Sequence, residues 1–150
     1  MKPVIEQLES ITTKYLPLLK KVQSRDWTKK PSPDKWSKIE ELGHLVDSAQ
    51  NNIRRFIVGQ YDVRPHIVYK QDEWVRLSNY QEYAPDDLIS LWVLVNRHIC
   101  SILRNIDPDK GENLVMTQEV HTISWLAMDY NKHLLHHLHH LLGLEPVVYP

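Results

Sequence analysis

Apolar residues recur at helical spacings in four stretches of the chain. The first stretch, residues 4–22, repeats Ile, Leu, Tyr and Val every three or four positions and ends before Pro31 and Pro33, which forbid a regular helix. The other three cover residues 38–58, 85–106 and 123–142. Four amphipathic helices with no convincing pair of strands bury their apolar faces best in a bundle. We therefore predict an all-α fold, a four-helix up-and-down bundle.

The ends of these helices carry residues that begin and end helices. Ser37 and Glu40 have the spacing of a capping box, in which each side chain satisfies an amide of the first turn. Thr122 suits the N-terminal cap of the last helix, and Gly143 suits its end. Residues 61–84 are rich in aromatic side chains but show no sustained period. Because segments of this length without regular structure are often functional, we expect this one to roof a pocket or meet a partner.

Composition and charge narrow the range of functions. The chain has 18 basic and 19 acidic residues, so its net charge of −1 provides no basic field for nucleic acid or an anionic membrane. No apolar run approaches the ~20 residues that cross a bilayer. No linker divides the sequence, so residues 1–150 are predicted to form a single domain. Cys100 is the one cysteine, which excludes an internal disulfide and favours the cytoplasm.

Histidine is the most unusual part of the composition: there are nine, and five lie between residues 133 and 140. Two pairs have the i, i+4 spacing that lets two imidazoles bind one ion, His133 with His137 and His136 with His140. On a helical projection the first pair lies nearer to the apolar face, where a metal is partly desolvated. We therefore select His133 and His137. The alternative is that these histidines are solvated or simply part of the core.

A third ligand should come from another helix, because two imidazoles alone bind a metal weakly. His44 is the one histidine of the second helix, and it lies among polar residues rather than on the apolar stripe. These polar neighbours are Asp47, Ser48, Asn51, Asn52 and Arg55. They form either a solvent-facing surface or the polar wall of a cleft, and spacing alone leaves both open. Asp47 and Asn51 are candidates to orient His44 or a bound water, although ordinary helix polarity explains them equally well.

Three segments taken together resemble the DinB-like superfamily. KWSKIEELGHLVDSAQNNIRRF resembles its pattern of Trp-Ser or Trp-Thr opening a helix, followed by His-Leu or His-Val, Asp-Ser and Asn. TISWLAMDYNKHLLHHLHHLLGL resembles the last helix of the family, with its H-x-x-H-H signature, and YKQDEWVRL is similar to the Tyr-x-x-x-x-Trp segment of the YfiT-like branch. The resemblance covers most of the chain from Trp36 onward. It implies a bundle of the DinB/YfiT type with unusual connectivity, often dimeric.

The resemblance also implies a metal site. The first metal histidine of the family matches His44, the first histidine of the closing signature matches His133, and the second of its adjacent pair matches His137. All three are therefore expected to bind one divalent ion, nickel or zinc, since imidazole accepts both. The chain departs from the family at Gly43, where a further histidine often precedes the first ligand.

Some branches of the family are thiol-dependent S-transferases or isomerases. The resemblance therefore implies, as the first expectation, transfer of a metal-bound low-molecular-weight thiol to a small electrophilic substrate. One alternative is a metal-dependent hydrolase that uses bound water against an amide or ester. Another is a metal-binding, dimeric stress-response bundle without catalysis. The expected partners are a small-molecule substrate and a second copy of the chain, which together form a homodimer.

Overall fold

The computed structural model describes residues 1–149, and Pro150, the last residue of the predicted domain, lies outside them. Four long helices make up most of the fold: α1 (Lys2–Lys20), α3 (Lys38–Val58), α5 (Pro85–Asn105) and α6 (Ile123–Leu142). Their bounds agree with the predicted ones to within two residues. The predicted all-α four-helix bundle is confirmed.

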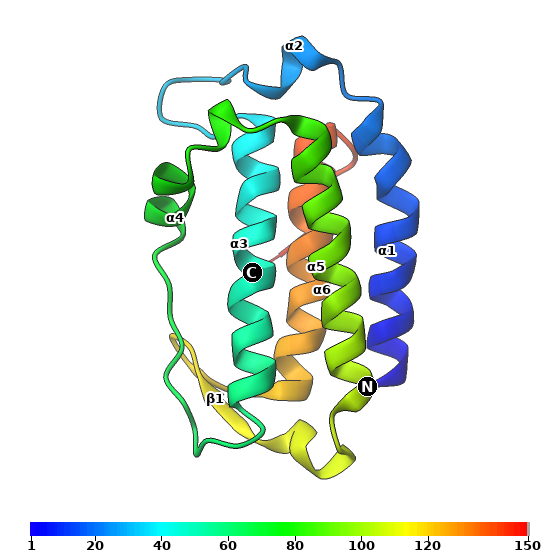
Figure 1. Ribbon diagram of the computed structural model, residues 1–150, viewed down its shortest axis with the longest axis vertical. Helices are drawn as coiled ribbons and strands as arrows, with labels where there is room; N and C mark the ends of the chain where they lie inside the picture. Colours follow the sequence, from blue (N-terminus) through cyan, green and yellow to red (C-terminus); the bar gives the residue numbers. More distant parts are fainter. Residues whose placement is uncertain (150) are drawn as a thin grey trace.

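The helices are connected in an unusual order. In Figure 1, α1 and α6 run in one direction along the bundle, and α3 and α5 run in the other. Both α1 and α3 pack mainly against α5 and α6, so the order around the bundle is α1, α5, α3, α6. Because α3 and α5 are parallel, the chain must return between them through a long crossover, residues 59–84, on the outside of α3. As a result, the antiparallel helices α3 and α6 are neighbours.

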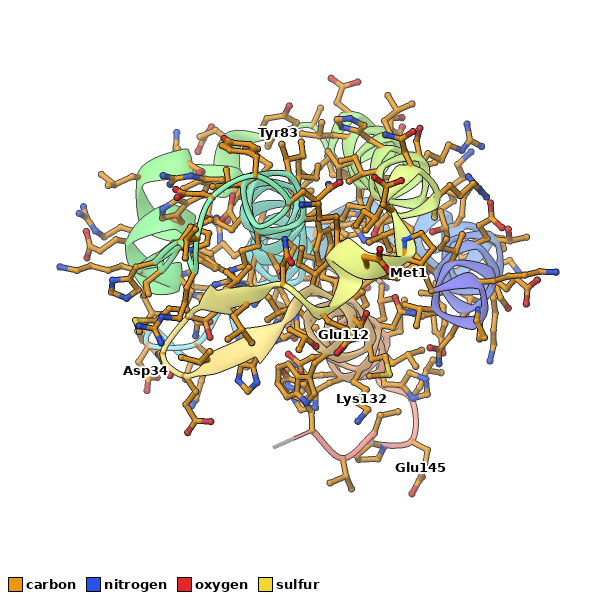
Figure 2. All side chains as sticks on the ribbon, turned by 90° about the horizontal axis from the view of Figure 1, so that it is seen from below. Met1, Asp34, Tyr83, Glu112, Lys132 and Glu145 are labelled. Carbon is orange, nitrogen blue, oxygen red and sulfur yellow. The ribbon has the colours of Figure 1, made fainter. Side chains whose placement is uncertain are left out.

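Short elements decorate the bundle: α2 (Ser24–Trp27), α4 (Gln71–Ser78), the 3-10 helices η1 (Tyr80–Glu82) and η2 (Pro108–Glu112), and strands β1 (Leu114–Met116) and β2 (Val120–Thr122). The two strands form an antiparallel hairpin. Figure 2, which looks along the bundle, shows α4 and the hairpin outside the four long helices. The sequence pattern did not predict α4, because it has only eight residues and buries one of them, Val75, so no apolar stripe appears.

The ends of the long helices coincide with the capping residues that the sequence contains. Ser37 and Glu40 form the predicted capping box, and the backbone N–H of Ser37 donates to the Glu40 carboxylate at 2.8 Å. Thr122 caps α6, and Gly143 ends it with a left-handed φ of 66°. Apolar residues of all four long helices meet in one core. Within residues 1–149, no helix has the length and hydropathy of a membrane-spanning segment.

Candidate metal site between α3 and α6

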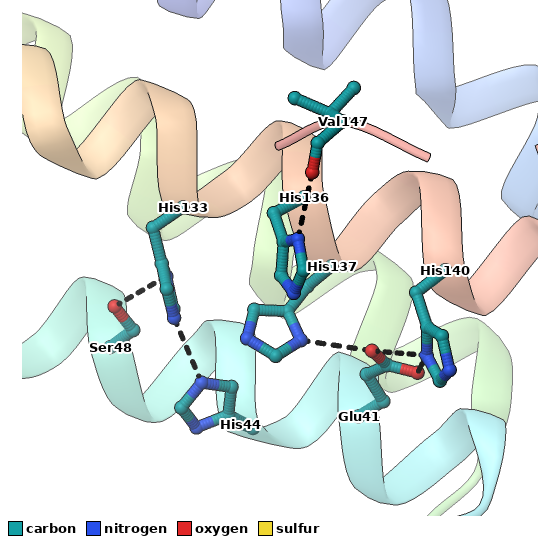
Figure 3. Close-up of polar contacts among 8 residues, drawn as sticks. All are labelled: Glu41, His44, Ser48, His133, His136, His137, His140 and Val147. Carbon is teal, nitrogen blue, oxygen red and sulfur yellow. Dashed lines mark hydrogen bonds and ion pairs between the residues drawn. The ribbon is translucent and has the colours of Figure 1, made fainter. Parts of the chain in front are cut away.

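His44 of α3 and His133 and His137 of α6 lie together where the two helices pack (Figure 3). One ring nitrogen of each lies within 4.8 Å of the other two. Nε2 of His44 is 3.1 Å from Nε2 of His133. Two ligands of a tetrahedral zinc ion are about 3.3 Å apart when each Zn–N bond is about 2.0–2.1 Å. The spacing of the His44 and His133 nitrogens therefore suits two ligands of one such ion, and the three residues together could hold a metal ion.

The polar face of α3 is the buried wall of this site, not a solvent-facing surface. Five of its residues are buried: His44, Asp47, Ser48, Asn51 and Asn52. Helix α6 and the crossover cover them. The spacing of these residues along α3 could not show whether they meet solvent or a cavity. Buried polar side chains need partners, and this requirement explains why so many of them also bond to one another or to the α3 backbone.

Burial holds two of the three imidazoles in the neutral form. It lowers the pKa of His44 to about 3 and the pKa of His133 well below its usual range, and the neighbouring His137 adds to both effects. The ring of Trp36 lies over His44, with 4.8 Å between ring centroids. Only a neutral imidazole offers a lone pair to a metal. Both side chains are therefore ready to act as ligands at neutral pH.

Glu41, which was not predicted from the sequence, holds the third imidazole. Nδ1 of His137 and Nδ1 of His140 each lie 2.9 Å from its carboxylate (Figure 3). Because an ionised carboxylate only accepts hydrogen bonds, the Nδ1–H of His137 donates to it, and Nε2 keeps its lone pair. A carboxylate in this position fixes both the tautomer and the orientation of a metal-binding histidine. The sequence feature that could have indicated this role is the position of Glu41 three residues before His44. That feature is not specific, because glutamate is common in the first turn of a helix.

The two residues expected to orient His44 have other partners. The hydroxyl of Tyr80 donates to Oδ1 of Asp47 at 2.5 Å, and the side chain of Asn51 donates to the backbone carbonyl of Asp47 at 2.9 Å. Within residues 1–149, the buried Nδ1 of His44 has no hydrogen-bond partner. Burial raises the pKa of Asp47 to about 6. A role for Asp47 or Asn51 in holding a bound water stays a prediction.

The second i, i+4 pair of α6 does not join this cluster. His136 bonds through Nδ1 to the backbone carbonyl of Val147, at 3.0 Å. His140 lies at the exposed end of the site, with 73% of its side chain accessible to solvent, and contacts Glu41. Of the two pairs, His133 and His137 are therefore the ones that lie with His44, and metal binding by them stays a prediction.

Gly43, the departure from the family pattern, allows the crossover to pack against α3. A Cβ atom at this position would lie 2.2 Å from a ring carbon of Tyr80. The ring therefore occupies the space that a side chain at position 43 would need, and its hydroxyl reaches Asp47 from there. The ring of Tyr80 in η1 thus fills the space beside α3 that a side chain at position 43 would otherwise fill. This contact attaches the crossover to the helix that carries His44.

Replacing Gly43 by alanine should destabilise the protein, the opposite of the usual result inside a helix. Alanine normally gains about 1 kcal/mol over glycine there, but overpacking costs about 1–3 kcal/mol. We expect urea denaturation to show a net loss of unfolding free energy relative to wild type. In a Tyr80→Ala background, where the ring is absent, the same Gly43→Ala change should cause no loss relative to Tyr80→Ala alone. Gly111→Ala is the control, because its new Cβ meets only the hydroxyl of Ser124. A more stable Gly43→Ala protein would contradict the contact.

An open cavity of about 820 Å³ lies beside the histidine cluster and is lined in part by His133 and His137. Val68 and Tyr69 of the crossover form part of its wall, together with Trp125 of α6. A cavity of this volume accommodates a small organic molecule. The expectation that the crossover would cover a pocket agrees with this arrangement.

The segment that follows α6 closes one side of the cavity. The hydroxyl of Tyr149 donates to Asp129 at 2.9 Å, and its ring centroid lies 5.5 Å from that of His133. The carbonyl of Val147 accepts from His136 on the same side (Figure 3). Tyr149 therefore lies on the wall of the cavity beside His133.

A four-helix bundle with three converging imidazoles beside a cavity defines a class of candidate metalloproteins. The family model of the DinB superfamily matches residues 7–141, and the chain belongs to this superfamily. The resemblance found in the sequence is therefore confirmed. No curated protein matches the chain in sequence.

Two solved structures share the fold. YfiT from Bacillus subtilis, described as a probable metal-dependent hydrolase with an unusual four-helix bundle topology, has a TM-score of 0.83 and 19% identity, with 96% of this chain and 88% of that chain covered. A mutant of a mycothiol-dependent maleylpyruvate isomerase has a TM-score of 0.77 and 13% identity, with 97% of this chain covered. This chain spans only 61% of the isomerase. At these identities the likeness shows a common fold and nothing finer.

Proposed function

We propose that the protein is a metal-dependent thiol S-transferase that holds one divalent ion on His44, His133 and His137. The observation that carries the proposal is the convergence of three ring nitrogens within 4.8 Å of one another, beside a cavity that a small molecule can enter. Three protein ligands leave room for a further ligand, which is typical of catalytic and not of structural sites. The names of the two structural relatives, one metal-dependent and one thiol-dependent, support this combination.

In the proposed reaction, the thiol gives its proton to solvent, its sulfur forms a bond to an electrophilic carbon, and the leaving group departs with the bonding electron pair. His44, His133 and His137 would hold the divalent ion, whose positive charge would favour a thiolate at neutral pH. Glu41 orients His137 through its 2.9 Å hydrogen bond, and the ring of Trp36 packs against that of His44. The cavity has the volume to hold a thiol and an electrophile together.

Hydrolysis is the second candidate, favoured by the description of YfiT. It needs a general base beside the attacking water. Asp47, with its pKa raised by burial to about 6, has suitable basicity. However, Asp47 is buried and is already bonded to Tyr80, and it is not among the residues that line the cavity. Thiol transfer does not require such a base and is therefore the first choice.

Other parts of the proposal come from the sequence. We take residues 1–150 as one domain that works as a homodimer in the reducing cytoplasm, where low-molecular-weight thiols are abundant. Cys100 is buried in α5, and burial raises the pKa of its thiol to about 11, so it does not compete as a nucleophile. Nickel and zinc both suit the three imidazoles.

The test is a thiol-transfer assay with monochlorobimane, in which the thiol displaces chloride. Bacillithiol, mycothiol and glutathione are compared on protein loaded with nickel or zinc. We expect turnover with one of these thiols, and its loss both in metal-free protein and in His137→Ala, while the exposed His140→Ala keeps it. Activity that survives in metal-free protein would exclude the mechanism. Hydrolysis of esters without thiol transfer would favour the second candidate, and a loaded but inactive protein would favour a non-catalytic bundle.

A further inference from the structure

The polar face of α3 continues beyond His44 to a positively charged side chain. Ser48, Asn52 and Arg55 follow His44 by four, eight and eleven residues, which keeps them on one side of the helix. All three line the same cavity as His133. Arg55 also lies beside Tyr69 of the crossover, with 5.9 Å between its Cζ and the ring centroid. One open space therefore connects the histidine cluster with a guanidinium group.

Arg55 is held in place by neutral groups. Its Nε and Nη2 both donate to the backbone carbonyl of Ile67 at 3.2 Å, and Nη1 donates to the side-chain oxygen of Asn52 at 3.3 Å. A guanidinium has five N–H groups in a rigid fork, and these contacts use three. Among the ion pairs of residues 1–149, none includes Arg55. Its position is fixed, while its charge and two of its donors are free for a ligand.

The environment of this charge favours an anion. Arg55 is half-buried, and burial lowers the pKa of its guanidinium, although arginine remains protonated at neutral pH. Asp129, Tyr69 and Tyr149 face it and partly offset the effect of burial. Asp129 does not come within ion-pair distance of Arg55 and instead accepts from the hydroxyl of Tyr149. Glu119, also on the cavity wall, is mostly in solvent. A partly desolvated cation with no carboxylate in ion-pair contact gains most from a bound carboxylate.

We propose that Arg55 binds the carboxylate of an elongated small molecule whose opposite end reaches the histidine cluster. Along α3, about 1.5 Å per residue places Asn52, which contacts the guanidinium, roughly 12 Å from His44. A ligand of about six to eight carbons spans this distance, allowing for its contacts at both ends. The reactive end of this ligand rests on the proposed function, whereas the Arg55 subsite does not require a metal. The carboxylate belongs either to the thiol or to the electrophile.

The first experiment uses metal-free protein and needs no knowledge of the natural ligand. Isothermal titration calorimetry compares phenylacetate with its neutral analogue phenylacetamide. We expect the carboxylate to bind about tenfold or more tightly, the usual effect of a charge-assisted hydrogen bond. Arg55→Gln should remove this preference and Arg55→Lys should keep part of it, whereas Arg54→Gln, an exposed neighbour with the same charge change, should keep all of it. Circular dichroism checks that each variant is folded.

The second experiment identifies which molecule carries the carboxylate. On nickel-loaded protein, 6-mercaptohexanoate is compared with 6-mercaptohexanol, and phenylacetate with phenylacetamide in the presence of 2-mercaptoethanol. If the larger Arg55-dependent preference occurs in the first pair, the carboxylate is assigned to the thiol, and if it occurs in the second pair, to the electrophile. Equal affinity for charged and neutral members throughout, or equal loss in Arg54→Gln, would overturn the proposal. If no nickel binds, the proposed function fails, but the metal-free comparison still decides the role of Arg55.

Discussion

Replacing His133 by alanine is expected to abolish stoichiometric metal binding and leave the bundle folded. His133 is one of the three donors: its Nε2 is 3.1 Å from that of His44, and its ring is next to that of His137. Two imidazoles on different helices remain, and the loss of a direct ligand should weaken binding by more than the roughly 10–100-fold cost of losing an outer partner. The half-buried side chain is outside the apolar core, and alanine suits a helix. Inductively coupled plasma mass spectrometry of tag-free protein, with circular dichroism, measures both effects.

His140→Ala is the matched control for this prediction. It removes an imidazole from the same helix, one turn beyond His137, but a largely exposed one. This variant should keep about one ion per chain, as the wild-type protein should. If His133→Ala also keeps its ion, the metal lies elsewhere. If the wild-type protein binds neither nickel nor zinc, the three histidines are structural, and the non-catalytic interpretation becomes the better one.

Replacing Glu41 by glutamine should weaken metal binding by about 10–100-fold, the usual cost of losing the outer partner of a metal-binding histidine. Glutamine has nearly the same shape, but it is neutral and can donate as well as accept. It therefore no longer forces the proton of His137 onto Nδ1, and the basicity of Nε2 falls. Competition with a chromophoric chelator measures the affinity of the nickel- or zinc-loaded protein.

Two comparisons separate this effect from a general loss of stability. His140→Ala removes the second hydrogen bond to the Glu41 carboxylate, yet it should leave the affinity within a few-fold of wild type, because His137 keeps its partner. Urea denaturation of metal-free Glu41→Gln shows whether the bundle itself has changed. Unchanged metal affinity in a folded Glu41→Gln protein would mean that the carboxylate only helps α3 and α6 to pack.

The local features of the fold were predictable from the sequence, and its connectivity was not. Periodicity and caps such as Ser37 and Thr122 act over a few residues, so they placed the long helices correctly. No local sequence feature indicates that α3 and α5 run in parallel or that α1 and α3 are not neighbours in the bundle. The resemblance to a family implied an unusual connectivity, but not which helices run in parallel. The short helix α4 was missed because its stability comes from packing on α3 and not from a stripe of its own.

The residues of the candidate site were likewise predictable only where local sequence features identify them. His133 and His137 were selected from their spacing and from the apolar face of their own helix. His44 could not be separated from a solvated residue, because a polar face looks the same in sequence whether it meets water or a cavity. Glu41 was missed for a related reason. Its contact with His137 depends on the register of α3 against α6, which only tertiary packing determines.

The pairing of α3 with α6 also affects when the site exists. His44 and His133 are 89 positions apart in the chain, so their nitrogens meet only after the first and last parts of the bundle have associated. In the unfolded chain, an ion would find only local histidine pairs, which bind weakly. A bound ion would therefore favour the native state by mass action, by about 2.7 kcal/mol at a free concentration 100 times its Kd. It would also oppose separation of α6 from α3, so the loaded protein would unfold more slowly than the metal-free protein.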